Sequence, residues 1–194
     1  MNSFQHIHDR WTPKHAADTY GIDAWGNGYF HVDENGEVVV TPAGKGEGPR
    51  IGMIRIIEDI RERGWSLPVL LRFEGILYSR IKAINESFRQ AISEYEYEGA
   101  YRGVYPIKVN QQHQVIDEIS TYGKEFHHGL EAGSKPELIA AMAYLEDPEA
   151  LLICNGYKDE EFVDLGLYAR RMGINCIFVI ETVQEVPLIL KRSQ

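Results

Sequence analysis

The chain has 194 residues, of which 44% are hydrophobic and 25% are charged, which is typical of one globular domain or slightly more than one. Its net charge of −9 at pH 7 argues against a general nucleic-acid or anionic-membrane surface. The sequence contains no apolar run long enough to cross a membrane and no apolar stretch of signal-peptide length at its start. We therefore expect a cytoplasmic protein without a nucleic-acid or membrane partner.

The first 50 residues differ in pattern from the rest of the chain. Residues 1–20 are polar and predict irregular structure, whereas residues 29–41 contain two strand-like runs around Asn35-Gly36, which is typical of a β-hairpin. Residues 42–49 are rich in glycine and proline and predict a linker. We interpret residues 1–50 as an N-terminal segment composed of these three parts.

From Ile51 to the end, helical and strand patterns alternate. The apolar spacing predicts helices at 51–63, 76–97, 111–122, 134–145 and 159–172, with a further helix beginning at Thr182, and strands at 67–73, 100–109, 126–132, 151–154 and 175–180. Near-continuous apolar strands that alternate with helices are typical of a parallel sheet covered by helices. The fold class is therefore α/β.

Two architectures fit this alternation, a (β/α)8 barrel and a doubly wound open sheet. No G-x-G-x-x-G pattern follows any predicted strand, which lowers the case for a dinucleotide-binding sheet. About five strand–helix units are visible, whereas a barrel needs eight. We expect residues 51–194 to be the N-terminal part of a longer barrel.

The two cysteines, Cys154 and Cys176, both lie in apolar, strand-like segments. Buried free thiols in a reducing compartment are the simplest interpretation, with a disulfide as the less favoured alternative.

Ligands of parallel α/β sheets gather at the carboxyl ends of the strands. Reading these ends in order gives the candidate residues Lys108, Glu131, Gly133, Ser134, Asn155, Lys158 and Glu181. Each has a structural alternative. Glu131 and Glu181 can be solvated carboxylates, Gly133 a turn residue, Ser134 the N-cap of a helix with Pro136 and Glu137 in its first turn, and Lys158 a surface residue of a loop.

Lys108 is the sharpest candidate for chemistry. Alternation along a strand over 100–109 places it on the same face as Val104 and Pro106. A lysine inside a buried strand has a lowered pKa and, once neutral, can condense with an aldehyde as a Schiff base. The alternative is a lysine at the rim of the sheet whose amine reaches water.

Several long blocks of the sequence resemble the biosynthetic arginine decarboxylases. The blocks are GVYPIKVNQQ around Lys108, GLEAGSKPEL at 129–138, ICNGYKDEEF at 153–162, YGIDAWGNGYF at 20–30, LPVLLRFEGIL at 67–77 and VIETVQEVPLIL at 179–190. They occur in the order and spacing of that family, from about Trp11 onward. Glu74 and His113 depart from the residues that the family usually has at these positions.

The resemblance implies a pyridoxal-phosphate enzyme of fold type III, a (β/α)8 barrel joined to a β-domain, which the N-terminal hairpin would join. Lys108 would be the Schiff-base lysine, with Glu131, Gly133, Ser134, Asn155 and Glu181 as candidate cofactor contacts. The implied reaction converts L-arginine to agmatine and carbon dioxide in polyamine (putrescine and spermidine) biosynthesis, in a homo-oligomer with which magnesium is associated.

The resemblance also implies that the phosphate-binding loop and the substrate-binding carboxylates lie beyond Gln194. We therefore expect the chain to be a fragment that is inactive alone. Two alternatives remain at this point: a barrel that binds pyridoxal phosphate without decarboxylation, and a related decarboxylase acting on ornithine, lysine or diaminopimelate.

Overall fold

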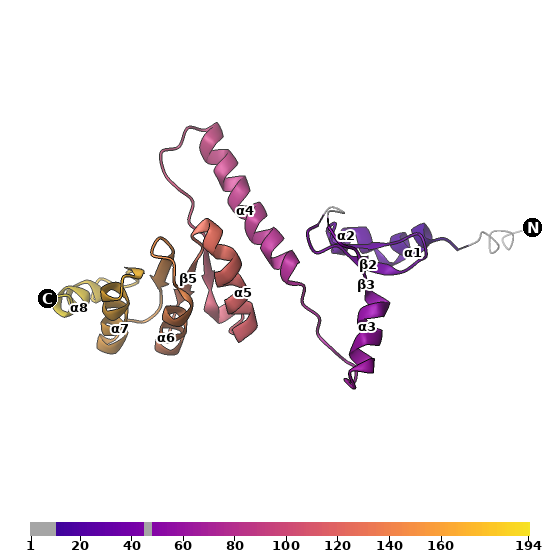
Figure 1. Cartoon of the computed structure of the whole chain (residues 1–194). Coiled ribbons are helices and arrows are strands. Elements are labelled where there is room, and N and C mark those ends of the chain that lie inside the picture. The colour runs from indigo at the N-terminus through magenta and orange to yellow at the C-terminus, as the bar shows by residue number, and fades with distance from the viewer. Residues whose placement is uncertain (1–10, 45–47) are drawn as a thin grey trace, which may run out of the picture. The chain divides into compact units, whose positions relative to one another are not determined.

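The computed structural model describes residues 11–44 and 48–194, and the chain divides into two compact units, Met1–Ser79 and Arg80–Gln194. Each unit is described by itself below; Figure 1 labels their helices and some of their strands. The domain limits predicted from the sequence, 1–50 and 51–194, refer to the domains of the expected longer barrel protein. They remain a prediction.

The first unit begins with two helices, α1 (Pro13–Tyr20) and α2 (Ile22–Gly26). The prediction of irregular structure up to residue 20 is therefore wrong for α1. The helix is nucleated by a reciprocal cap, in which the Thr12 hydroxyl accepts from the His15 backbone N–H at 3.3 Å and the Thr12 N–H donates to His15 Nδ1 at 3.3 Å. A histidine here does what a glutamate does in the usual capping box, so the pattern is easily missed.

A small antiparallel sheet follows, in the order β1 (Phe30–Val32), β2 (Val38–Val40) and β3 (Ile51–Gly52). Strands β1 and β2 pair antiparallel within the range predicted as a hairpin. The Asp33 carboxylate accepts the backbone N–H groups of Glu37 and Asn35, both at 2.9 Å. These bonds, that from Glu37 first, hold the pKa of Asp33 below its ordinary value.

The predicted helix over 51–63 starts later than expected, as α3 (Met53–Glu62). Its first two predicted residues instead pair with β2, Ile51 with Val40 and Gly52 with Val39. The predicted linker over 42–49 lies partly outside the described residues, which end at 44 and resume at 48.

The predicted strand over 67–73 is wrong, because these residues form no strand. Pro68 has no N–H to contribute to a ladder, and Leu67 and Leu70 are exposed. No strand in the described part of the first unit pairs with this segment. An apolar run of strand length does not form a strand without a neighbour to bond.

The division between the units falls within the long helix α4 (Glu74–Glu94). In the second unit, Phe88 of α4 stacks on Tyr101 with ring centroids 3.9 Å apart, and the Arg89 guanidinium lies 5.1 Å from the centre of the Phe126 ring. These contacts hold the second half of α4 to two segments, one at Tyr101 and one at Phe126, that each precede a strand of the second unit.

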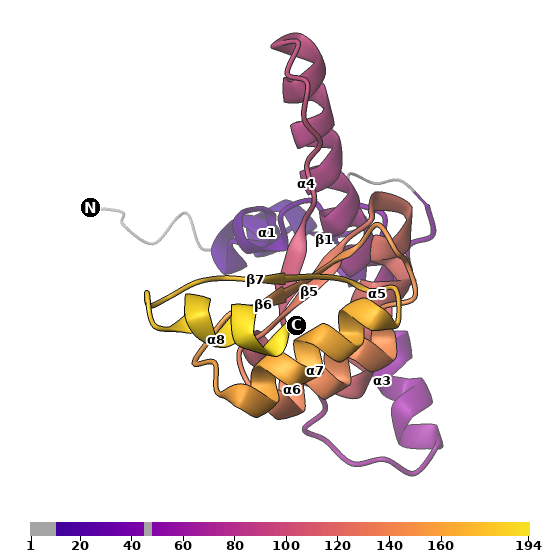
Figure 2. The same ribbon diagram turned by 90° about the vertical axis from the view of Figure 1, so that its left-hand side faces the viewer.

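The second unit is built on a parallel sheet of four strands in sequential order, β4 (Val104–Pro106), β5 (Gly129–Ala132), β6 (Leu151–Cys154) and β7 (Asn175–Phe178). The connecting helices are α5 (His113–Gly123), α6 (Lys135–Tyr144) and α7 (Glu160–Arg171), and α8 (Glu185–Arg192) follows β7. Helices α5, α6 and α7 lie on one face of the sheet (Figure 2). The predicted α/β fold with a parallel sheet is confirmed.

The two faces of this sheet are covered differently. Leu130, Ala132, Leu152 and Cys154 are fully buried or nearly so, together with Leu138 of α6 and Phe162 of α7. The intervening residues Glu131, Ile153 and Ile177 are register partners on neighbouring strands and are only partly covered. Since successive strand residues point to opposite faces, one face forms the core and the other is more open.

Strands β4, β5 and β7 are shorter than predicted whereas β6 has its predicted bounds, and four rather than about five parallel strands occur in the described part of the chain. The predicted strand over 126–132 starts only at Gly129, because Lys124–Phe126 form a 3₁₀ turn and His127 has a left-handed φ of 52°. The helix predicted to begin at Thr182 begins at Glu185. The two cysteines are buried free thiols, as predicted.

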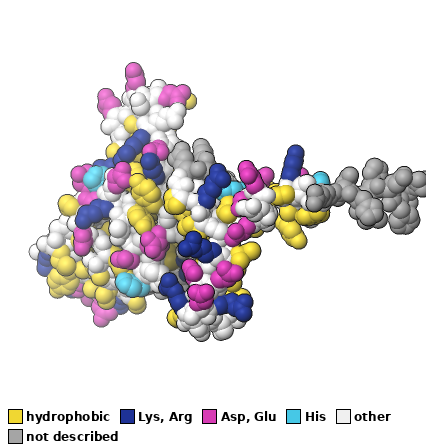
Figure 3. Space-filling view, turned by 45° about the vertical axis from the view of Figure 1, so that its right-hand side comes forward, with side chains coloured by type: hydrophobic (Ala, Val, Ile, Leu, Met, Phe, Trp, Pro, Cys, Tyr) yellow, Lys and Arg dark blue, Asp and Glu magenta, His cyan; other side chains and the backbone are white. Residues whose placement is uncertain are grey.

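The charge of the chain is not gathered in one patch on the face drawn in Figure 3, where acidic and basic side chains are interspersed with apolar ones. Within the described residues, no helix is both long enough and apolar enough to cross a membrane.

Candidate active site at the carboxyl edge of the parallel sheet

The parallel sheet brings the ends of its strands to one edge. Pro106 is the register partner of Glu131, and Ala132, Cys154 and Phe178 form a continuous row at the ends of β5, β6 and β7. Five of the six predicted cofactor contacts lie in the segments that follow these strand ends, and the sixth, Glu131, lies near the end of β5 itself. The topology therefore places them at the edge where parallel sheets bind ligands.

Lys108 does not lie in a strand, contrary to the prediction. Strand β4 ends at Pro106, and Ile107–Val109 form a 3₁₀ turn in which Ile107 is buried. Neighbouring residues in a 3₁₀ helix point about 120° apart, so burial of Ile107 turns Lys108 outward. The Lys108 side chain is 62% exposed, and the prediction of a lysine buried within a strand is wrong. The rim position considered as its alternative is the observed one.

Glu131 links the first two segments of the edge. Its Oε1 lies 3.5 Å from Lys108 Nζ and accepts a hydrogen bond from Asn155 Nδ2 at 3.4 Å. The Glu131 side chain is 21% exposed and stands on the open face of the sheet. A carboxylate from one strand thus contacts the predicted cofactor lysine and the predicted contact after β6.

The loops after β5 and β6 approach each other through two glycines. Gly156 has a φ of 131°, and a Cβ built on it would lie 2.4 Å from the Gly133 carbonyl oxygen. A Cβ on Gly133 would lie 3.1 Å from the Asn155 carbonyl oxygen. Only residues without a side chain permit this approach of two backbones. Gly133 is therefore a close-packing residue as well as a turn residue.

Ser134 occupies the N-cap position of α6, as predicted, but its side chain makes no capping hydrogen bond. The first turn is closed instead by Glu137, whose Oε2 accepts from the Gly133 N–H at 2.7 Å. The Ser134 hydroxyl is thus not engaged in capping its own helix.

Lys158 is buried, contrary to the prediction of a surface lysine. Its side chain has 0% exposure, and its Nζ donates to the Gly156 carbonyl at 2.6 Å and lies 3.3 Å from Glu185 Oε2. The left-handed φ of Gly156 turns the chain back, so that the lysine enters the interior within two residues. Sequence polarity alone could not reveal this reversal.

Glu185 is the buried partner of Lys158, with a side chain that is 6% exposed. Its Oε2 also accepts from the Glu181 N–H at 2.9 Å. Burial by itself would raise the pKa of Glu185, but the Glu181 N–H and the Lys158 ammonium outweigh it and hold this pKa below its ordinary value. The Glu181 side chain itself is exposed.

Glu185 was not among the predicted site residues, although one signal could have found it. Thr182 and Glu185 have the T-x-x-E spacing of a capping box, in which the glutamate turns back onto the preceding backbone. Ser134 and Glu137 have the same spacing. In both loops the glutamate accepts the N–H of the residue just before the Ser or Thr, Gly133 in one and Glu181 in the other.

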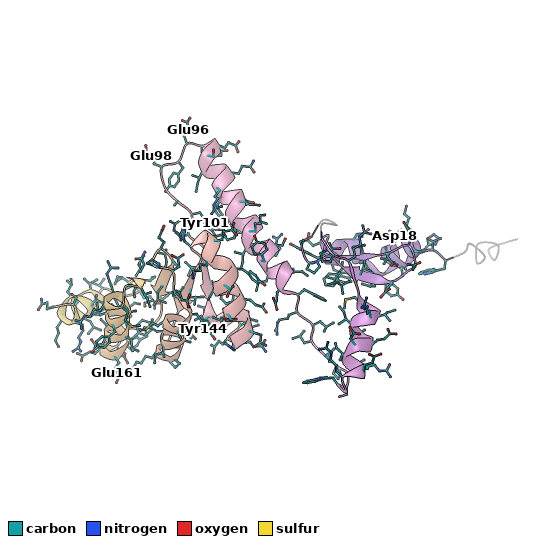
Figure 4. All side chains as sticks on the ribbon, viewed as in Figure 1. Asp18, Glu96, Glu98, Tyr101, Tyr144 and Glu161 are labelled. Carbon is teal, nitrogen blue, oxygen red and sulfur yellow. The ribbon has the colours of Figure 1, made fainter. Side chains whose placement is uncertain are left out.

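A more exposed ion pair flanks the edge at the start of α7. Lys135 Nζ lies 2.6 Å from Asp159 and also contacts Glu161, which Figure 4 labels at the beginning of that helix. The hydrogen bond from Lys135 holds the pKa of Asp159 below its ordinary value. Asp159 in turn caps α7 by accepting the Phe162 N–H at 2.9 Å.

The two thiols lie just beneath this edge, with Cys154 Sγ 3.4 Å from Cys176 Sγ. The contact with Cys176 and burial together raise the pKa of Cys154 well above the ordinary range of a thiol. This thiol is therefore in its neutral form at physiological pH and fills space in the core.

No group of three metal-binding side chains occurs within the described ranges 11–44 and 48–194. His6, His8 and Asp9, which the sequence suggests are solvent-exposed, lie outside those ranges, and His15 is engaged in the cap of α1.

Comparison with known proteins identifies the family. Residues 81–194 match the profile of "Pyridoxal-dependent decarboxylase, pyridoxal binding domain". The chain is 46% identical over 184 residues to a biosynthetic arginine decarboxylase of Gloeobacter violaceus and 45% identical over 186 residues to one of Prochlorococcus marinus. These matches cover 95% and 96% of this chain but 28% of each relative.

The crystal structure of the biosynthetic arginine decarboxylase SpeA from Campylobacter jejuni is also similar, with a TM-score of 0.82 and 37% identity over 89% of this chain and 28% of that one. The chain belongs to the family of pyridoxal-dependent decarboxylases, whose pyridoxal-binding domain profile matches residues 81–194. The resemblance to biosynthetic arginine decarboxylases is confirmed, and the chain spans about 28% of the length of the relatives that it matches.

Proposed function

We propose that the gene product containing this chain decarboxylates L-arginine to agmatine and carbon dioxide, with pyridoxal phosphate held by Lys108. The reaction would serve polyamine synthesis. The names of the relatives, with 42–46% identity over most of this chain, support the choice of arginine. The observation that carries the proposal is an accessible primary amine, that of Lys108, at the carboxyl edge of the parallel sheet.

The residues present fit a pyridoxal cofactor. Lys108 is exposed, and among the described residues it pairs with a partly exposed carboxylate, that of Glu131, an interaction worth at most about 1 kcal/mol. The ion pair therefore positions the Lys108 amine but is weak enough to leave it available for bonding to a cofactor. At the same edge of the sheet, Gly133 and Gly156 let the backbones of two loops pack against each other without side chains at these two positions. A covalently held ligand can approach such an edge closely.

Each side chain of the edge has a role in this proposal. When bound, pyridoxal phosphate supplies the electron sink for the carbon that loses carbon dioxide. Lys108 supplies the amine that holds the cofactor aldehyde. Glu131 orients that amine, and Asn155 fixes Glu131 through its amide N–H. The exposed carboxylate of Glu181 is available to a cationic group of the cofactor or the substrate.

The hydroxyl of Ser134, which caps no helix, and the backbone at Gly133 complete the proposed cofactor contacts. We further propose that the four parallel strands form part of a (β/α)8 barrel, and that the antiparallel sheet of the first unit joins a β-domain. The open face at Glu131, Ile153 and Ile177 would then face the barrel interior. A cytoplasmic homo-oligomer associated with magnesium remains a prediction from the resemblance.

The test is carbon dioxide release by the purified gene product supplied with pyridoxal phosphate and, in parallel, arginine, ornithine, lysine or diaminopimelate. We expect release from arginine alone. Lys108→Ala should reduce it by more than about a hundredfold, because the amine takes part in bond making. Borohydride reduction should attach the cofactor covalently to the wild-type protein and not to the variant.

Lys124→Ala is a matched control, because Lys124 is also exposed and also pairs with a carboxylate, that of Glu146 at 3.2 Å, but precedes β5 instead of following β4. It should leave both readouts unchanged. Release from another amino acid would move the specificity. Cofactor attachment at Lys108 without any release would favour the non-catalytic barrel, and a protein that binds no cofactor would contradict both functions.

A further inference from the structure

The Lys158–Glu185 pair is the most deeply buried ion pair of the described chain, with side chains 0% and 6% exposed. Taking two charges out of water is costly, and the cost is offset only with good geometry and further hydrogen bonds. Both partners have such bonds, Lys158 to the Gly156 carbonyl and Glu185 to the Glu181 N–H. All of these bonds end on backbone atoms of the candidate site.

The pair joins three loops of the carboxyl edge. Lys158 and Gly156 belong to the loop after β6, and the Gly156 backbone is in close contact with Gly133 in the loop after β5. Glu185 and Glu181 belong to the segment after β7. Through one ammonium and one carboxylate, the position of the loop after β6 therefore depends on the position of Glu181.

The loop after β5 shows what the lysine adds. There Glu137 accepts the Gly133 N–H, and its other oxygen accepts from Gln111 Nε2 at 3.4 Å in an exposed contact. The same carboxylate device thus works at α6 with only an exposed amide as its other partner. At α8 the carboxylate is buried and receives a lysine from the neighbouring loop. The Glu137 carboxylate closes only its own loop, whereas the Glu185 carboxylate also connects its loop to the loop after β6.

We propose that Lys158 and Glu185 are positioning residues for pyridoxal-phosphate binding, which hold the loop after β6 and Glu181 in register. This inference rests on the proposed function. A rival interpretation is that the pair merely stabilises the fold, and the experiment is chosen to separate the two.

Removal of one partner leaves the other charge buried and alone, whereas removal of both leaves neither. We would compare Lys158→Met, the double variant Lys158→Met/Glu185→Leu and the control Lys135→Met in the full gene product. Lys135 is an apt control because it also pairs with carboxylates at this edge but is partly exposed. The readouts are cofactor affinity by absorbance titration of the apoprotein and the thermal unfolding midpoint.

Lys158→Met should weaken cofactor binding by roughly 10- to 100-fold, the range found for partners that orient a binding group. The double variant should regain much of the thermal stability that Lys158→Met loses. It should still bind the cofactor weakly, because the ion pair no longer joins the loop after β6 to the segment after β7. Lys135→Met should change the affinity by less than about threefold. If Lys158→Met fails to fold, the double variant carries the test.

Wild-type affinity in the double variant would overturn the proposal, since stability without the pair would then suffice. So would an affinity in Lys158→Met equal to that of Lys135→Met. Hydrogen exchange of residues 179–184 in the apoprotein gives a readout independent of the cofactor, and it should accelerate in the double variant, which lacks the acceptor of the Glu181 N–H. If the wild type binds the cofactor normally but the exchange of these amides is unchanged in the double variant, the positioning role of the pair is overturned and the proposed function is not. A wild-type protein that binds no cofactor overturns the proposed function, and the cofactor role of the pair with it.

Discussion

The two edges of the parallel sheet differ in where their polar side chains find partners. At the carboxyl edge, Glu137, Lys158 and Glu185 all bond to backbone groups of the loops that follow the strands. At the amino edge, the pairs join side chains to one another, as in Lys124–Glu146, with side chains 59% and 80% exposed, and His127–Asp147 at 2.8 Å. The carboxyl edge fixes the course of its loops, whereas the amino edge mainly pairs side chains, with Asp147 also accepting the Glu149 backbone N–H at 2.9 Å.

The amino edge also leaves polar atoms without partners. His128 Nδ1 and Ser120 Oγ are buried side-chain atoms with no hydrogen-bond partner in the described chain, and both residues line a cavity of about 360 Å³. Burial without a partner costs free energy. Buried polar side chains of this unit therefore find hydrogen-bond partners more fully at the edge that holds the candidate site, where the positions of the loops matter for binding.

Gly156→Ala, at the carboxyl edge, is expected to lower the free energy of unfolding more than any other substitution considered below. A left-handed φ of 131° and a Cβ 2.4 Å from the Gly133 carbonyl both oppose a side chain, so the free energy of unfolding should fall by roughly 3 kcal/mol. Gly173→Ala is the control, because its φ is 92° but no atom lies within 4 Å of the added Cβ. It should cost only about 1 kcal/mol.

Urea unfolding of the gene product, followed by circular dichroism, measures both changes. Equal losses in the two variants would mean that the contact between the loops at Gly133 and Gly156 adds nothing beyond backbone strain. The carboxyl edge would then be no more tightly packed than an ordinary helix end.

The sequence predicted the elements around this edge far better than the environment of its charged residues. Strand β6 occurs at its predicted position, and α7 begins within one residue of its predicted start, with Asp159 as its N-cap, because these depend on local apolar periodicity and capping. Lys108 and Lys158 were both misplaced. The exposure of Lys108 depends on the 3₁₀ turn after Pro106, and the burial of Lys158 depends on the left-handed Gly156. Such turns are decided by packing between segments distant in sequence.

The same limit explains the segment 67–73. A run of apolar residues shows that a segment can form a strand, but only a neighbouring strand makes it one. The start of α1 differs, because Thr12 at the N-cap and Pro13 in the first turn are helix-start signals that the prediction missed, and only His15 at the third position is unusual. The candidate site residues, in contrast, could be named from strand ends and resemblance, since topology alone brings them to one edge.

A smaller effect is expected from pH at the amino edge. Burial holds the pKa of His128 below 6.5, so the unfolded chain binds a proton more readily than the folded protein does. This contribution to stability is full above pH 6.5 and is lost as the pH falls below it, with a slope of at most about 1.4 kcal/mol per pH unit. Urea midpoints between pH 7.5 and pH 5 should therefore decline less in His128→Gln than in the wild type.

Asp147 does not mimic this effect. The Glu149 N–H and the contact with His127 outweigh burial and hold the pKa of Asp147 below 3.8, so its contribution is lost only in more acidic solution. Parallel declines in the wild type and in His128→Gln would show that the buried imidazole does not govern stability in this pH range.

The smallest effect is expected where the amino edge pairs exposed charges. Lys124→Met removes the partner of Glu146, but both side chains stay largely in water, so the free energy of unfolding should change by less than about 1 kcal/mol. The change should shrink further in high salt, which screens exposed pairs. A loss as large as that in Gly156→Ala, measured by the same urea unfolding, would erase the difference between the edges. The amino edge would then also depend on specific contacts, and the inference that backbone-directed charges mark the binding edge would lose its basis.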